Sequence, residues 1–244
     1  MQEVVSVPSA VAPAPQTKSS PESRAGWSGE LDGAFSFNRS TYTTRTMSIS
    51  MDVVRPLRHA ELDGELRYDR ESILVENSPA QVEKDRYDAN LKYKHFWVDS
   101  PYYTYVSPRV RADRFGFYQR ARGLRLGGGR KFEGASERWE LSVEAGTGYR
   151  EAYLSTQEHI SETLYSFTAK ARWVLNDNLL VKLNWIAEAS NREAYQTIAL
   201  SLRNKLSDRL GLKYELLQRR AFTTQDAPRR DKEFQADVGL SYAF

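Results

Sequence analysis

The sequence lacks cysteine, which excludes disulfides, zinc–thiolate sites and thiol nucleophiles together. It has no run of roughly 18 or more apolar residues, so a transmembrane helix is excluded. An excess of one charge is missing as well: 35 basic residues stand against 32 acidic ones, which argues against a nucleic-acid partner. The start of the chain has no basic segment followed by an apolar core, so we expect no intact signal peptide.

What the sequence does contain is alternation of apolar and polar residues, which begins near Trp27 and continues to the end of the chain. Alternation with a period of two predicts strands that have one apolar and one wet face. We expect about twelve strands, near residues 30–37, 47–53, 60–68, 87–97, 102–114, 118–131, 138–145, 165–175, 179–188, 198–202, 210–216 and 234–244. About ten residues is the length that a tilted strand needs to cross a bilayer.

The last predicted strand carries the clearest pattern. Its apolar positions include Val238, Leu240, Tyr242 and Phe244, and the chain ends on the aromatic. This resembles the final strand of bacterial outer-membrane β-barrels, and the resemblance implies that these four residues are the signal read by the barrel-assembly machinery. The alternative is an ordinary amphipathic terminal strand of a soluble protein.

The lengths of the connections add a second indication. Long polar stretches are predicted near 72–84, 152–162 and 222–232, and shorter ones elsewhere. Short periplasmic turns, longer external loops and an even number of strands are typical of a transmembrane barrel with both termini on the periplasmic side. We therefore predict an all-β fold, a transmembrane antiparallel up-and-down β-barrel in the outer membrane. A soluble β-sandwich or lipocalin-like barrel is the alternative.

Residues 1–26 differ from the rest, because Pro, Ser and Ala dominate there. Such a composition cannot bury enough apolar surface to become ordered. We predict a disordered periplasmic tail over 1–26 and the barrel over 27–244. The tail is a candidate for binding a periplasmic partner, and we expect the chain to be a mature form without its signal.

The middle of the chain resembles a known family in three segments: Arg111–Phe115, the glycine-rich Leu124–Arg130, and Leu141–Arg150. These segments resemble the YdiY-like family of outer-membrane proteins described as salt-induced. The resemblance is close over roughly residues 90–155, and it implies an outer-membrane barrel of unassigned activity. From the residues alone, the glycines are expected to permit bending, with Tyr149 covering a neighbouring glycine.

The three histidines give no constellation for catalysis. His59 is expected at a periplasmic turn, His95 on the lipid face and His159 in an external loop. Only His159 has serines and glutamates nearby, and nothing holds them in register for nucleophilic catalysis. We therefore predict a protein that is not an enzyme, with no cofactor and no metal site.

The inward face is strongly charged. The first three predicted strands are acidic there, whereas the fourth to sixth and the eighth are basic, and opposed walls of this kind create a transverse field in a lumen. The residues expected to line the lumen and contact solute are Lys92, Lys94, Arg109, Arg111, Arg125, Lys170, Arg172, Glu65 and Glu144. Two functions remain open: a narrow channel for small polar or anionic solutes, or a closed structural or interaction barrel whose charges pair across the interior.

Two further residues point outward near the external rim. Arg120 and Arg122 share a face with Leu124 and Leu126, where they could contact the phosphates of lipopolysaccharide among the outer-membrane lipids. A solvated charge at the edge of a loop is the alternative.

Overall fold

In the computed structural model, residues 26–39, 43–74, 80–115, 118–134, 138–223 and 232–244 are described. Twelve strands form a closed antiparallel barrel, in which each strand pairs with its neighbours in sequence and the last pairs with the first. The strands are β1 (Ser28–Arg39), β2 (Thr43–Pro56), β3 (Ala60–Leu74), β4 (Gln81–Phe96), β5 (Tyr102–Asp113), β6 (Tyr118–Glu133), β7 (Trp139–Leu154), β8 (His159–Asn176), β9 (Leu179–Ala189), β10 (Glu193–Lys205), β11 (Leu210–Thr223) and β12 (Lys232–Ala243). Among these residues no helix is long and apolar enough to cross a membrane.

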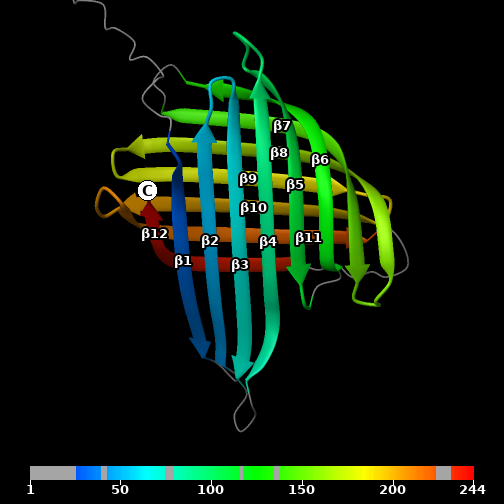
Figure 1. Cartoon of the computed structure of the whole chain (residues 1–244). Helices are drawn as coiled ribbons and strands as arrows, with labels where there is room; N and C mark the ends of the chain where they lie inside the picture. Colours follow the sequence, from blue (N-terminus) through cyan, green and yellow to red (C-terminus); the bar gives the residue numbers. More distant parts are fainter. Residues whose placement is uncertain (1–25, 40–42, 75–79, 116–117, 135–137, 224–231) are drawn as a thin grey trace, which may run out of the picture.

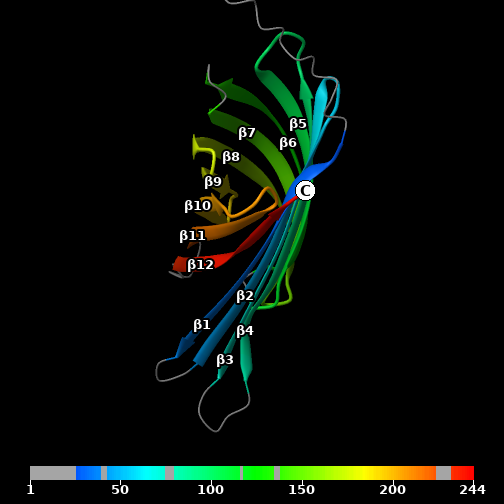
Figure 2. The same cartoon turned by 90° about the vertical axis from the view of Figure 1, so that its left-hand side faces the viewer.

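The barrel has two walls whose strands cross at a steep angle. Figure 1 shows β1–β4 in front of β8–β12, and Figure 2 shows the two walls meeting near the C-terminus. Phe244 exchanges two backbone hydrogen bonds with Gly29, 3.0 and 3.1 Å long. Both ends of the barrel segment therefore lie together, at what we call the terminal end, and the opposite end is the distal end.

The apolar residues lie outside and the charged residues inside. Phe35, Leu183 and Val238 are 64%, 41% and 51% exposed, whereas the interior Asp69 is fully buried at 0%. A soluble barrel would bury the first three in its centre. The predicted fold class is confirmed, and the lipocalin-like alternative is wrong.

Aromatic side chains gather on the outer surface near the terminal end. Trp139 and Trp173 are directly opposite each other on β7 and β8, and Trp97 follows β4 at the same end. Each of the three is at least 44% exposed. Amphipathic rings at this position are typical of the aromatic girdles at a membrane–water interface.

The connections are shorter than the sequence predicts. β3 ends at Leu74 and β4 begins at Gln81. Likewise, β7 ends at Leu154 and β8 begins at His159. Most of the stretches 72–84 and 152–162 is therefore strand, and His159 opens β8 instead of lying in a loop. At the distal ends of β7 and β8 the inward residues are apolar, and Ala152, Leu154 and Ile160 form a small buried cluster with Tyr118 that holds the extended strands together. Within the third stretch, residues 224–231 lie outside the described residues, as do residues 1–25 of the predicted tail.

The fifth strand keeps one register through Pro108. Arg109 pairs with Asn90 and Val106 pairs with Tyr93, so no residue is inserted between them. Tyr103 and Tyr105 consequently face inward with the arginines and are 2% and 7% exposed.

These two tyrosines account for the glycines of β6. A Cβ atom on Gly127 would lie 2.7 Å from the ring of Tyr105, and one on Gly129 would lie 2.5 Å from the ring of Tyr103. The rings thus lie flat on a wall that has no side chains. Tyr149, which the sequence suggested for this role, is on the outer surface and 49% exposed.

Candidate functional site

The interior contains one sizeable cavity in the described part of the chain, with a volume of about 580 Å³. Part of its wall is made by small, uncharged inward residues in the middle of β10, which are Thr197, Ala199 and Ser201. The opposite corner of the barrel, where Tyr103 and Tyr105 cover glycines, is filled. Outside this filled corner, the cavity is lined by residues of β1 to β11.

Ion pairs connect the two walls across this interior. Glu30 of β1 accepts from Lys182 of β9, and Glu65 of β3 accepts from Lys170 of β8. Asp32 of β1 pairs with Lys213 of β11 in the same way. The acidic side chains are on the first three strands as predicted, but of these three cations only Lys170 lies on a strand predicted to be basic, whereas Lys182 and Lys213 lie on β9 and β11.

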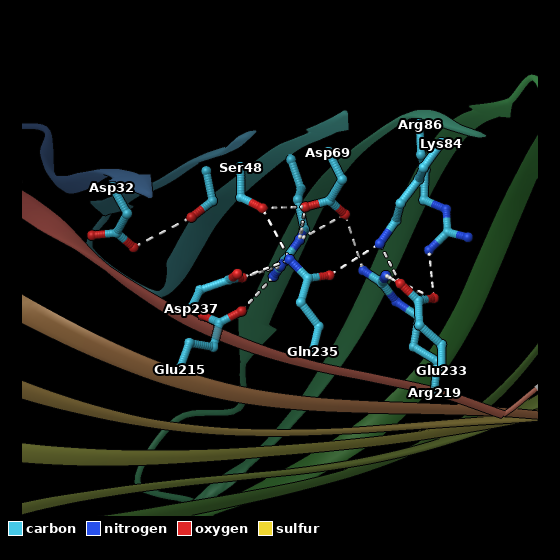
Figure 3. A network of polar contacts seen from close by, with 12 residues as sticks. Asp32, Ser48, Asp69, Lys84, Arg86, Glu215, Arg219, Glu233, Gln235 and Asp237 are labelled. Atoms are coloured by element: carbon cyan, nitrogen blue, oxygen red, sulfur yellow. Dashed lines mark hydrogen bonds and ion pairs between the residues drawn. The ribbon is translucent and has the colours of Figure 1, made fainter. Parts of the chain in front are cut away.

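A denser network closes the distal part (Figure 3). Glu233 of β12 accepts hydrogen bonds from Arg86 and Arg219 at 3.2 Å, and it also pairs with Lys84. Arg86 donates in addition to Asp113 at 2.6 Å. One carboxylate from the last strand thus holds three cations from β4 and β11.

The network continues through Asp69 of β3. Its carboxylate accepts from Ser48 at 3.0 Å, Arg67 at 3.1 Å and Arg219 at 3.3 Å. Arg67 also donates to Glu215 at 2.7 Å. Because Asp69 is completely buried and receives three donors, its carboxylate is not available to a solute.

A second closed point lies in the filled corner. Lys92 of β4 pairs with Glu144 of β7, and the Tyr103 hydroxyl donates to the same carboxylate at 3.0 Å. The Lys92 ammonium also lies 4.9 Å from the centroid of the Tyr105 ring. Lys92 and Glu144 are only 6% and 3% exposed.

Two arginines share a third carboxylate. Arg109 and Arg125 donate to Glu188 of β9 at 2.9 and 2.8 Å, and Arg109 also donates to Asp88 at 2.5 Å. A small cavity of about 30 Å³ lies beside Arg109, Arg125 and Glu188.

The residues predicted to contact solute all face the interior, but they fall into three groups. Those that line the 580 Å³ cavity are Glu65, Lys94, Arg109, Arg111, Lys170 and Arg172. Arg125 lines the smaller cavity. Lys92 and Glu144 are buried against each other. Contact with solute stays a prediction for each of them.

Sequence reasoning missed the partners that close the lumen. Glu233 and Arg219 flank the stretch predicted to be an external loop, which hides their place on paired strands. Glu188 lies on the polar face of its predicted strand, and this position was the available signal. Nothing in the local sequence indicates that it meets Arg109 and Arg125.

The residues predicted to face outward do so. Val238, Leu240, Tyr242 and Phe244 are 41% to 53% exposed on the barrel surface. Arg120 and Arg122 lie toward the distal end of β6. Arg122 is 77% exposed and donates to Glu151 at 2.6 Å, which leaves less of its charge for another partner.

No group of three histidine or acidic side chains in the described ranges is arranged to hold a metal ion. A closed antiparallel barrel with an apolar exterior and an ionised interior defines the class: the fold is that of an outer-membrane β-barrel. More specifically, the chain belongs to the family described as "Protein of unknown function, DUF481", which it matches over residues 31–244. No curated protein matches the sequence.

Three solved structures of similar fold are distant in sequence. The NanC porin is 7% identical with a TM-score of 0.52, and the alignment covers 88% of this chain and 98% of that one. The translocator domain of the autotransporter NalP from Neisseria meningitidis is 12% identical with a TM-score of 0.47, covering 89% and 87%. An anion-selective porin from Comamonas acidovorans is 10% identical with a TM-score of 0.43, covering 90% and 99%.

Proposed function

We propose that the protein is a narrow channel of the outer membrane that passes small polar or anionic solutes. The observation that carries this proposal is the cavity of about 580 Å³, which eleven basic and eight acidic side chains line. A lumen lined by charge stays hydrated, and an excess of cations lowers the energy of an anion within it.

The Glu233 network lies across the distal part of the interior. The channel therefore conducts weakly, through rearrangement of side chains that are still partly exposed. Glu233 is 29% exposed and Lys84 is 11% exposed, so water reaches this network from the lumen.

Single-channel recording in a planar bilayer tests the proposal. The refolded barrel should give small ohmic steps, with a reversal potential under a salt gradient that indicates preference for anions. Replacing Lys170 by Gln should weaken that preference, because it removes a cation from the cavity wall. Arg130→Gln removes an exposed cation from the outer surface and should leave selectivity unchanged. Absence of any conductance step would refute the channel.

The second candidate is a closed barrel with a structural or interaction role, and the cross-wall ion pairs favour it. Asp69, Lys92 and Glu144 are each less than 10% exposed, as in a filled interior. Silence in bilayers, together with intact heat-modifiable mobility on gels, would support this function and not the channel.

The outer face suggests how the protein reaches and sits in its membrane. We propose that Val238, Leu240, Tyr242 and Phe244 are recognised by the barrel-assembly machinery, since they form an exposed apolar row that ends at the C-terminus. Removal of Phe244 should reduce the amount of folded protein in outer-membrane fractions, and an unchanged amount would refute this role.

Three further roles are proposals with their own tests. Lipopolysaccharide bound by Arg120 and Arg122 should be lost from the double alanine variant in a pull-down. A periplasmic partner bound by residues 1–26 should be lost when that segment is deleted. Salt-induced expression, which the YdiY-like resemblance implies, should appear as a rise in protein level when salt is raised.

A further inference from the structure

Three carboxylates lie side by side on the front wall of the cavity. In the strand register Glu30 of β1 is opposite Asp52 of β2, and Asp52 is opposite Glu65 of β3. Like charges directly opposite each other destabilise a sheet. The row therefore requires cations nearby.

A row of cations lies on the other wall. Arg172 of β8 is directly opposite Lys182 of β9, and Lys170 is two residues before Arg172 on the same face. All three line the cavity of about 580 Å³, and so do Asp52 and Glu65. The two rows thus face one space.

The flanking members of the rows neutralise each other. Glu30 pairs with Lys182, and Glu65 pairs with Lys170. The remaining members, Asp52 and Arg172, make neither an ion pair nor a hydrogen bond within the described residues, and both are exposed to the cavity. One free carboxylate and one free guanidinium are therefore left on opposed walls between two satisfied pairs.

We propose that Asp52 and Arg172 form a binding site for a small zwitterion, an amino-acid-like solute with separate ammonium and carboxylate groups. The guanidinium of Arg172 offers parallel donors that match a carboxylate, and Asp52 accepts from the ammonium. A simple anion would be attracted by Arg172 but repelled by Asp52. A simple cation would be attracted by Asp52 but repelled by Arg172. A dipolar solute offers one charged group to each wall.

This site deepens the proposed channel function, because it names a class of solute for the same cavity. Binding is nevertheless measurable without transport. A detergent-solubilised barrel can bind the zwitterion even if it conducts nothing.

Ligand-observed saturation-transfer NMR on the refolded barrel provides the test, with 4-aminobutyrate, butyrate and butylamine as probes. We expect 4-aminobutyrate to bind about fivefold more tightly than either single-charge probe, the effect of one additional partly exposed charge pair. Asp52→Asn should abolish the advantage over butyrate, and Arg172→Gln should abolish the advantage over butylamine. Arg130→Gln on the outer surface should change nothing.

The results separate this site from the channel. Equal binding of all three probes, or tighter binding of butyrate, would overturn the zwitterion site even if the barrel conducts. Preferential binding of 4-aminobutyrate without conductance would support the site and refute the channel. Heat-modifiable mobility controls for folding, and both variants should fold, because neither side chain has a partner to lose.

Discussion

Replacement of Glu144 by Gln should destabilise the barrel strongly, although the change removes only one charge. The carboxylate side chain is 3% exposed and accepts from the ammonium of Lys92, whose side chain is 7% exposed, and from the Tyr103 hydroxyl. The substituted amide would keep the shape of the side chain. It would leave the lysine charge buried without a counterion.

The magnitude follows from this burial. Removing one partner of a buried ion pair costs about 3–5 kcal/mol, because the other charge stays uncompensated. The pair of Glu65 and Lys170 also joins two walls, but its side chains are 36% and 34% exposed. Exposed pairs contribute about 0.2–1 kcal/mol, so Glu65→Gln is the matched control with a small effect.

Equilibrium unfolding in urea, followed by tryptophan fluorescence of the barrel in detergent, measures both variants. The unfolding free energy of Glu144→Gln should fall by about 3 kcal/mol more than that of Glu65→Gln. Adding Lys92→Met to Glu144→Gln should recover most of the loss, since no buried charge remains. If both single variants lost the same stability, burial would not be the cause.

Three other outcomes are expected. Glu233→Gln should increase single-channel conductance, because three cations lose the carboxylate that holds them together; unchanged or lower conductance would contradict the distal closure. Gly129→Val should lower the refolding yield measured by heat-modifiable mobility, since the new side chain would occupy the place of the Tyr103 ring. Gly128→Val on the outer face is the control and should refold normally. Equal yields of the two variants would refute this packing. Phe244→Ala should reduce the unfolding free energy of the barrel in urea by about 1–3 kcal/mol, because the ring packs against Gly29 at the closing seam. An unchanged urea midpoint of unfolding would show that the ring serves only assembly.

Alternation, the aromatic terminal strand and the even number of strands together predict the barrel. A period of two decides which side of a strand each residue faces, so Val238 and Leu183 were correctly placed outside and Lys170 inside. Even the less regular fifth strand followed this rule, because Pro108 occupies a strand position without an insertion. At the distal ends of β7 and β8 the pattern changes, because apolar Leu154 and Ile160 face inward there, and alternation with apolar residues outside does not predict these ends.

The interior could be predicted only as a set of charges. Glu65 and Lys170 are 105 residues apart in sequence, and Glu30 and Lys182 are 152 apart. Which interior charges pair depends on the stagger of the twelve strands and on the cross-sectional shape of the barrel. The filled corner depends similarly on tyrosines of β5 lying over glycines of β6, a relation between two strands that neither segment reveals by itself.

The pairing between β1 and β12 has a consequence for biogenesis. Those strands are joined over five register pairs, from Glu30 with Ala243 to Ala34 with Gly239, and by the two hydrogen bonds of Gly29 with Phe244, whereas β1 and β2 share twelve pairs. Until the β1–β12 pairing forms, Glu30 and Asp32 of β1 are not held opposite Lys182 and Lys213. Closing the seam therefore brings the carboxylates of β1 and β3 opposite the lysines of β8, β9 and β11, so the same contact that completes the sheet also compensates its buried charges.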